Sequence, residues 1–421
     1  MNRIRLGALA LLAVFAGAAV AEDGFQFSGD IRSRYSGQTF PDNSLFNELA
    51  GSYAQDLTSI PRLKFGYDTG PWDLRADYQF IAWYGDTIEY TRQLPPGIQA
   101  LSGRLPDDRT RLFDLTDVIR DEGKTALVQR LDRLSAGYTG DKVVVRVGRQ
   151  AITWGNGMFY TPMDIFNPFD PAAVDTEYKS GDDMVYGQYL RASGDDLQTV
   201  MVVRRNFITE DVEAADSSLA VKYHGVGMEG EYDALIAQHY DEPLVGFGGN
   251  RNLGGAVLRG DVTVAFTEGD DAVASLVTSG SYSWTWGGKN ISGVLEYFFN
   301  GFGQSDGRYS AMDLAQNPEL VERLVRGELF TLGRHYVAAS AMIEMTPLFL
   351  VTPNAFVNLS DGSALLQFVT QNDIAENVLL LGAVNLPVGA DGTEFGGIET
   401  DMPNQYLSRG LGFFMQLAWY F

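Results

Sequence analysis

The sequence predicts an all-β protein, a transmembrane antiparallel up-and-down β-barrel of about eighteen strands with short helices in its outer loops. Three observations predict this fold class: segments that alternate between apolar and polar residues, connections that alternate between short and long, and an aromatic final residue, Phe421. An alternation with a period of two gives a strand two different faces. We therefore expect one face against lipid and the other around a wet lumen.

Export is predicted by the first residues of the chain. Two Arg residues precede an apolar run over residues 6–20, and Ala19-Val20-Ala21 fits a small-x-small cleavage site. We expect a signal peptide over residues 1–21, cleaved after Ala21, and a single barrel domain over 22–421 in the cell outer membrane of a Gram-negative bacterium. An N-terminal membrane anchor is the alternative, but the run is shorter than the roughly 20 apolar residues of a spanning helix.

Composition narrows the classes of function. The chain of 421 residues has no Cys, which excludes a disulfide framework and a thiolate metal site. Only three His are present, His224, His239 and His335, so a zinc enzyme is not expected. The net charge of −23 argues against nucleic acid as a partner. No cofactor and no metal are expected.

The alternation begins directly after the cleavage site. From Phe25 to Tyr35 one face carries Phe25, Phe27, Ile31 and Tyr35 with the small Gly29 and Ser33, and the other face is polar. Between Pro61 and Asp68, Leu63, Phe65 and Tyr67 alternate with Arg62, Lys64, Gly66 and Asp68. A soluble β-sandwich can alternate in the same way. Aromatic residues near strand ends and a densely charged polar face of mixed sign favour lipid outside and water inside.

Turn signals divide the chain into eighteen candidate strands. The weakest is 243–250, and sixteen strands is the alternative count. The candidates are 25–35, 59–69, 72–84, 129–139, 142–154, 183–193, 197–207, 218–226, 228–240, 243–250, 254–267, 272–286, 289–299, 335–346, 348–360, 363–373, 377–388 and 406–421.

The connections are of two kinds, which alternate strictly in the first half of the chain. Bacterial barrels have short periplasmic turns, longer outer loops and an even strand count, so both chain ends fall on the periplasmic side. The predicted long outer loops are 36–58, 85–128, 155–182 and 300–334.

Two of these loops contain helix signals. Asp107 to Glu122 predicts a helix that Asp107 or Asp108 caps and Gly123 ends. In the last long loop Asn317 can cap a helix with Pro318 at its first position, and Gly327 can end it. These helices pack on each other or on the barrel rim, or one or both fold inward and narrow a pore; the sequence leaves both interpretations open.

The third long connection is the most distinctive stretch. Three Pro residues and several aromatic residues between Thr161 and Pro171 predict a fixed shape, which is what a constriction needs. A calcium site within 164–183 is a weaker alternative, because no known loop spacing is present. The candidate constriction-loop residues are Asp164, Asn167, Asp170, Asp175 and Glu177.

This region also carries a family resemblance. Gly148-Arg149-Gln150, Trp154-Gly155 and the run Asn167-Pro-Phe-Asp-Pro171 resemble the large monomeric outer-membrane channel proteins related to the alginate exporter and to substrate-specific porins. The last strand, which ends at Phe421, resembles the assembly signal of outer-membrane barrels. The resemblance implies a monomer whose partners are the barrel-assembly machinery, outer-membrane lipid, lipopolysaccharide and a small solute. The acidic net charge is a departure, because an exporter of an anionic polysaccharide is expected to line its pore with Arg and Lys.

Inward-facing polar positions supply the pore-lining candidates. They either keep the lumen wet as a charge ladder, or their basic members form a track for an anionic or hydroxylated solute. The candidates are Arg32, Arg34, Arg62, Lys64, Arg75, Asp77, Arg146, Gln150, Arg259 and Asp261. Arg149 breaks the pattern: alternation places it towards lipid, at a cost of about 2–4 kcal/mol at mid-membrane. We expect a bulge at Gly148 to turn it inward.

The predicted function is a passive, selective outer-membrane channel for a small or oligomeric hydrophilic solute, of which an anionic solute is one candidate. An enzyme is not expected. A barrel enzyme acting on lipid or peptide would need one of the three His beside a nucleophile, and no spacing demands it. A structural barrel without transport is the remaining alternative.

Overall fold

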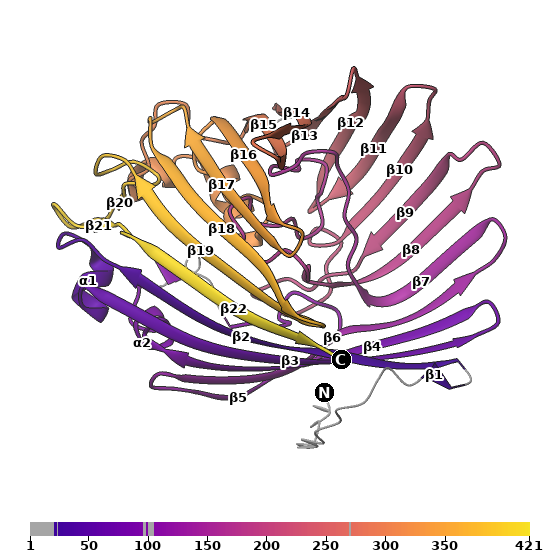
Figure 1. The fold of residues 1–421 in the computed structure, drawn as a ribbon, viewed down its shortest axis with the longest axis horizontal. Coiled ribbons are helices and arrows are strands. Elements are labelled where there is room, and N and C mark those ends of the chain that lie inside the picture. Colours follow the sequence, from indigo (N-terminus) through magenta and orange to yellow (C-terminus); the bar gives the residue numbers. More distant parts are fainter. Residues whose placement is uncertain (1–20, 23, 96–97, 100–104, 269–270) are drawn as a thin grey trace.

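The computed structural model describes residues 21–22, 24–95, 98–99, 105–268 and 271–421 (Figure 1). The predicted signal peptide therefore lies outside the described residues except for Ala21. That residue belongs to a two-residue strand, β1 (Ala21–Glu22), which pairs with Gln26 and Phe25. No helix among the described residues is long and apolar enough to cross a membrane.

Eighteen strands form one closed antiparallel wall, which confirms the predicted fold class and the higher strand count. Each strand pairs with its neighbour along the chain, and β22 closes the wall by pairing with both β19 and β2. The wall strands are β2 (Phe25–Thr39), β3 (Tyr53–Thr69), β4 (Trp72–Gly85), β6 (Thr125–Thr139), β7 (Val143–Gln150), β8 (Asp182–Leu190), β9 (Asp196–Val202), β10 (Ser218–Val226), β11 (Gly230–His239), β12 (Glu242–Leu253), β13 (Ala256–Phe266), β14 (Ala272–Trp286), β15 (Lys289–Phe299), β16 (His335–Thr346), β17 (Phe349–Asn358), β18 (Ala364–Ala375), β19 (Val378–Val388) and β22 (Gly412–Tyr420).

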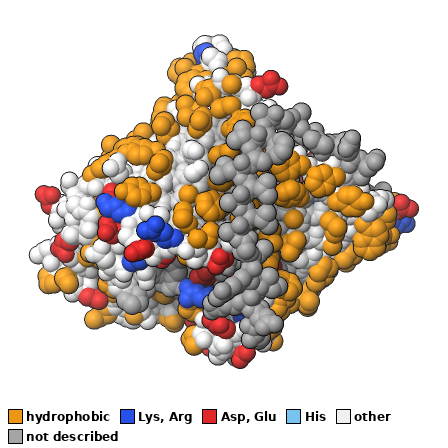
Figure 2. All heavy atoms as spheres, turned by 90° about the horizontal axis from the view of Figure 1, so that it is seen from below, with side chains coloured by type: hydrophobic (Ala, Val, Ile, Leu, Met, Phe, Trp, Pro, Cys, Tyr) orange, Lys and Arg blue, Asp and Glu red, His pale blue; other side chains and the backbone are white. Residues whose placement is uncertain are grey.

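The outward face of the wall is apolar, as lipid requires. Large aromatic side chains are exposed near the end with the short turns, where an interfacial girdle is expected. They are Phe25, Tyr67, Trp72, Tyr189, Tyr232, Tyr282, Trp284, Trp286 and Trp419. Figure 2 shows one side of the barrel, where hydrophobic side chains cover much of the wall and many of the charged ones lie towards the end that bears the long loops.

The predicted helix over Asp107–Glu122 is wrong. Residues 107–115 are irregular, and Thr116–Glu122 form a strand, β5, that pairs with the 125–130 part of β6. β7 pairs with β6 only over 134–139, so the other end of β6 would be left with unpaired backbone groups. Strand pairing with β6 therefore outweighs the weak helical stripe, and Gly123 lies in the tight turn between the two strands.

The second predicted loop helix is confirmed. α5 (Pro318–Arg326) begins after Asn317, whose side chain accepts a hydrogen bond from the amide of Leu320, and ends at Gly327 with a left-handed φ of 73°. Further short helices in the long connections include α1 (Leu45–Ala50), α2 (Asp86–Thr91) and α4 (Ala311–Ala315).

Some strand ends differ from the prediction. β2 and β3 extend beyond their predicted ends, so the first long loop shrinks to 40–52. Beyond the membrane both faces of a strand meet water, and the alternation that marks a strand fades. The predicted last strand, 406–421, begins in the wall only at Gly412, because Tyr406–Leu407 (β21) pair with Ile398–Glu399 (β20) inside a long connection over 389–411.

Arg149 is neutralised, and the predicted bulge is absent. The pairing of β7 with both neighbours is continuous through Arg149. Its side chain is fully buried and forms ion pairs of 2.9 Å with Asp108 and Asp183 beneath the irregular segment 107–115. Burial opposes the charge of Asp108, yet Arg149 and Arg111 outweigh burial and lower the pKa of Asp108 to about 2.

Candidate functional site: a loop-narrowed lumen

The connection between β7 and β8, residues 151–181, folds into the barrel; we call it the lumen loop. Figure 1 shows it in magenta in the interior. Met163, Ile165 and Phe166, together with Trp154, pack on the inner face of β8 to β11. The wall side chains that they contact are Met184, Val200, Val202, Ala220 and Leu235. Burial of this apolar cluster fixes one side of the loop to the wall.

A second apolar cluster fixes the loop to other strands. Tyr160 stacks on Phe298 of β15 with ring centroids 4.7 Å apart, and packs with Tyr336 and Phe356 of β16 and β17. The lumen loop thus contacts the wall on two separate groups of strands, so it crosses and narrows the lumen.

On the wall formed by β2, β3, β4 and β6, which we call the cationic wall, side chains hold the far end of the lumen loop. Asp175 accepts hydrogen bonds from Arg32 Nη1 at 2.8 and 3.0 Å, and one from Gln416 Nε2 at 2.9 Å. Burial disfavours the charge of Asp175, but these two partners outweigh burial and lower its pKa below the ordinary value.

Tyr178 sits among three cations of the same wall. Its ring centroid lies 4.2 Å from the Arg32 guanidinium, 4.0 Å from that of Arg62 and 4.7 Å from Lys64 Nζ. Its hydroxyl donates to Asp30 at 2.6 Å. Cation–π contacts of this kind hold the tyrosine ring among the cations of the wall.

One ion pair joins the two arms of the lumen loop. Lys179 Nζ lies 2.6 Å from both oxygens of Asp164 and from the carbonyl oxygen of Ile152. Burial raises the pKa of Asp164 to about 6 in spite of the lysine, and burial also lowers the pKa of Lys179. This ion pair between Lys179 and Asp164, which we call the brace, is therefore buried away from water.

The wall formed by β11, β13 and β15, which we call the acidic wall, presents carboxylates instead. Asp233, Asp261 and Glu296 accept hydrogen bonds from residues 156–160 of the lumen loop. Asp261 and Glu296 accept from loop donors on both of their oxygens, whereas Asp233 also contacts Lys222 and His224 of the wall.

A cavity of about 250 Å³ lies between the cationic wall and the lumen loop. Five cationic and three carboxylate side chains line it: Arg32, Arg34, Arg62, Arg130 and Lys179, with Asp30, Asp132 and Asp175. Arg130 is only 7% exposed and lies 3.1 Å from Asp132, but its Nε and Nη2 have no hydrogen-bond partner among the described residues.

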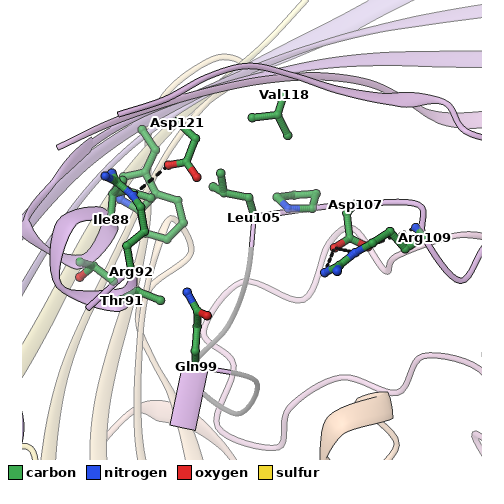
Figure 3. A pocket seen from close by; sticks show the side chains of 12 residues that line it. Ile88, Thr91, Arg92, Gln99, Leu105, Asp107, Arg109, Val118 and Asp121 are labelled. Carbon is green, nitrogen blue, oxygen red and sulfur yellow. Dashed lines mark hydrogen bonds and ion pairs between the residues drawn. The ribbon is translucent and has the colours of Figure 1, made fainter. Parts of the chain in front are cut away.

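A larger pocket of about 420 Å³ lies nearer the long loops, beside α2 and β5 (Figure 3). Figure 3 shows its two internal ion pairs, Arg92 with Asp121 at 3.1 Å and Arg109 with Asp107 at 2.8 Å. Pro106 lines both this pocket and the cavity, so the two lie next to each other.

The structure brings together part of the predicted pore lining. Arg32, Arg34 and Arg62 share the cavity, while Lys64 lies 3.3 Å from Asp30 and Asp77 lies 3.7 Å from Arg62. The other candidates are not part of the cavity. Arg75 pairs with Asp68, Arg146 with Asp73, Gln150 binds the carbonyl of Arg146, Arg259 binds Ser281, and Asp261 binds Asn156.

The constriction-loop candidates have separate partners. Asp164 pairs with Lys179, and Asp170 accepts from the amide of Ala172 at 2.8 Å. Asn167 has a positive φ of 51°, and Glu177 pairs with Arg32 and accepts from Tyr420. Within the part of the chain that the structure describes, no group of three or more His, Cys, Asp or Glu could hold a metal ion.

Sequence reasoning missed Arg130, Asp132 and Arg133 on β6, Tyr178 and Lys179 in the loop, and Glu296 on β15. On β6 a register irregularity opposite Asp77 and Tyr78 brings the adjacent Asp132 and Arg133 to one ion pair at 3.0 Å. A strict period of two places adjacent residues on opposite faces, so it cannot predict that Asp132 and Arg133 lie on the same face of the strand. The run Arg130-Leu131-Asp132-Arg133 was the available signal.

No protein-family model and no curated protein matches this chain. The fold matches several solved outer-membrane proteins. OccAB3 of Acinetobacter baumannii has a TM-score of 0.54 and 11% identity, covering 94% of this chain and 99% of that one. A BenF-like porin from Pseudomonas fluorescens has a TM-score of 0.52 and 11% identity, and the match covers 94% of this chain and 98% of the porin. Wzi of Escherichia coli, a carbohydrate-binding β-barrel involved in capsule assembly, has a TM-score of 0.51 and 9% identity, and the match covers 94% of this chain and 84% of Wzi. The chain has the closed-barrel fold of outer-membrane porins.

Proposed function

We propose that this protein is a passive outer-membrane channel whose narrowed lumen favours small anionic solutes. The observation that carries the proposal is the local charge of the cavity. Five cationic side chains face three carboxylates there, in a chain whose net charge is −23. Cations therefore outnumber carboxylates in the lining of this cavity, where the loop narrows the lumen.

The chemistry of the cations suits an anion. A guanidinium offers a planar fork of donors that matches a carboxylate or a phosphate in two parallel hydrogen bonds. Arg130 is almost fully buried, and its Nε has no hydrogen-bond partner in the part of the chain that the structure describes. Charged side chains that line a narrow passage set the sign of the ions that pass.

The similar folds support a channel. Among the similar structures is a BenF-like porin. The finer resemblance, to the alginate exporter, would extend the solute to an anionic polysaccharide, which the same cations would bind. The Wzi likeness points to a carbohydrate as the second candidate solute, without a charge requirement.

The remaining expectations belong to this proposal. A channel of this kind is exported with its signal peptide cleaved after Ala21, is assembled through its final strand and works as a monomer among outer-membrane lipid and lipopolysaccharide. Phe421 supports assembly through the final strand, because its backbone pairs with Gly29 and completes the wall beside β2.

A barrel enzyme is the alternative that the geometry disfavours. Ser218 Oγ lies 2.8 Å from His239 Nδ1, and His239 Nε2 lies 3.5 Å from Glu328. Ser218 is only 3% exposed and its hydroxyl accepts from Arg204 at 2.8 Å. A nucleophile must reach its substrate, and this one is enclosed.

The test is the reversal potential of the refolded protein in planar bilayers under a KCl gradient. We expect discrete conductance steps with anion preference. Arg130→Gln should lower that preference, whereas Arg259→Gln, which lies outside the cavity, should leave it unchanged. A folded barrel without conductance would contradict a channel, and cation preference would contradict an anionic solute. Block by a sugar acid but not by the neutral sugar would separate the anion from the carbohydrate candidate.

A further inference from the structure

Five consecutive backbone amides of the lumen loop point at two carboxylates of the acidic wall. Asp261 Oδ2 accepts from the amides of Asn156 at 2.6 Å and Gly157 at 3.3 Å. Glu296 accepts from the amides of residues 158, 159 and 160, at 2.6, 3.0 and 2.7 Å. The Asn156 side chain adds a hydrogen bond of 2.8 Å to Asp261 Oδ1.

These two carboxylates depend on the loop. Both are only 1% exposed, and neither forms an ion pair with a cation among the described residues. A buried carboxylate without a cation is stabilised only by the donors that surround it. Here most of those donors are amides of one short turn, so the position of that turn and the charge of the two side chains are coupled.

Glycine makes the approach feasible from the loop side. A Cβ on Gly157 would lie 1.9 Å from the carbonyl oxygen of Tyr160, so the turn cannot close with any other residue in this conformation. Gly155 has a φ of +93°, and a Cβ there would come within 3.2 Å of Asp261 Oδ2. The Trp-Gly-Asn-Gly motif of the sequence is explained by this contact.

A glycine of the wall also leaves space for the carboxylate of Asp261. Gly248 of β12 lies directly across from Asp261 in the strand pairing, and a Cβ on it would be 1.9 Å from Asp261 Oδ1. Together, the missing side chains at 155, 157 and 248 leave a slot in which the carboxylate of Asp261 meets the loop.

We propose that Asp261 and Glu296 are the positioning residues that hold the lumen loop across the pore and thereby set the size limit of the channel. This inference rests on the proposed function, since it concerns the dimensions of the same passage. Their role is mechanical: they bind backbone, so they fix where the loop lies, whereas the cations opposite act on the solute.

The test compares one double variant of the wall with a matched control. Asp261→Asn combined with Glu296→Gln keeps side-chain size but removes both charges and half of the acceptors. Glu344→Gln is the control, because Glu344 on β16 accepts from Asn290, a wall residue, at 2.9 Å. Unitary conductance in planar bilayers and swelling of liposomes in neutral sugars of increasing size are measured, and heat-modifiable gel migration verifies folding.

We expect the double variant to raise unitary conductance by roughly twofold and to admit neutral sugars that the wild type excludes, because pore diameter limits both. The control should match the wild type. A folded double variant with unchanged conductance and unchanged size limit would overturn the inference. Neutral sugars respond to pore width and not to charge, so a purely electrostatic effect of the two substitutions would not change the size limit.

Gly157→Ala keeps the inference falsifiable if the double variant does not fold. It disturbs the same turn from the loop and leaves every wall residue in place, so it should raise the size limit as well. A wild-type size limit in folded Gly157→Ala would contradict the proposal. Failure of the proposed function is distinguishable, because it would show as a wild-type barrel with no conductance.

Discussion

On the cationic wall, Arg side chains bind carboxylates of the lumen loop, whereas on the acidic wall carboxylate side chains bind the loop backbone. Arg32 meets Asp175 on one side, and Glu296 meets three amides on the other. A contact between two side chains can be removed by substituting either residue. Contacts to backbone amides can be altered only from the wall or by a change in the turn.

The difference also affects what remains for a solute. Asp261 and Glu296 of the acidic wall are occupied by the loop, while Arg130 Nε on the cationic wall has no hydrogen-bond partner among the described residues and lies beside a cavity of about 250 Å³. We infer that one wall positions the loop and the other contacts the solute, so pore width and ion preference should be separable by mutation.

The largest effect is expected at the brace between the two arms of the lumen loop. Lys179→Met leaves Asp164 buried without its cation, and removal of one partner of a buried ion pair costs about 3–5 kcal/mol. The backbone amides of the loop should then exchange faster next to both walls at once. Hydrogen–deuterium exchange over residues 152–179 of the refolded protein measures this, and unchanged exchange would show that the two walls hold the loop without the brace.

A smaller effect is expected at the cationic anchor. Asp175→Asn removes a carboxylate that accepts from Arg32 and Gln416, at a cost of about 1–3 kcal/mol for the hydrogen bonds lost. It also releases Arg32 and Arg34 towards the cavity, so anion preference should increase. The reversal potential in a KCl gradient measures the change, and a decrease would contradict an anion path along this wall.

A pH effect is expected where the connection 389–411 meets the strands next to the acidic wall. Glu394 accepts from Tyr336, Asn358 and the amide of Leu332 at 2.6, 2.8 and 2.9 Å, and burial raises its pKa from 4.5 to about 7. The docked loop therefore prefers the protonated carboxyl, and docking should weaken as pH rises from 4.5 to about 7.

Exchange of residues 389–397 below and above this pH range tests the prediction. Glu394→Gln measured under the same conditions corrects for the intrinsic pH dependence of exchange and should show no added change. If wild type and variant respond alike, Glu394 does not control docking.

The smallest effect is expected at Arg75, a predicted pore-lining residue outside the cavity. Its pair with Asp68 is 37% and 39% exposed, and exposed pairs contribute about 0–1 kcal/mol. Arg75→Ala should leave ion preference as in the wild type and change the urea midpoint little. A clear loss of anion preference would extend the solute path beyond the cavity.

The fold was predictable because lipid imposes one pattern on every wall strand. Alternation, turn signals and an even count were enough to place eighteen strands, and even the weak segment 243–250 is part of β12. The pattern failed where lipid no longer acts. Residues 116–122 lie beyond the short β7 and pair with β6, a contact that local periodicity does not contain.

The candidate site was only partly predictable for a related reason. Arg32, Arg34 and Arg62 follow from alternation, since they lie on the inward face of regular strands. Tyr178 and Glu296 depend on where the lumen loop lies, which is set by contacts between residues more than 100 positions apart. No local pattern encodes such contacts.

The most direct test measures ion preference and size limit together on two variants, Arg130→Gln on the cationic wall and Asp261→Asn with Glu296→Gln on the acidic wall. We predict that the first lowers anion preference at an unchanged neutral-sugar limit. The second should raise the sugar limit and keep the preference for anions. If both variants shift the same property, or neither shifts any, the division of roles between the two walls is wrong.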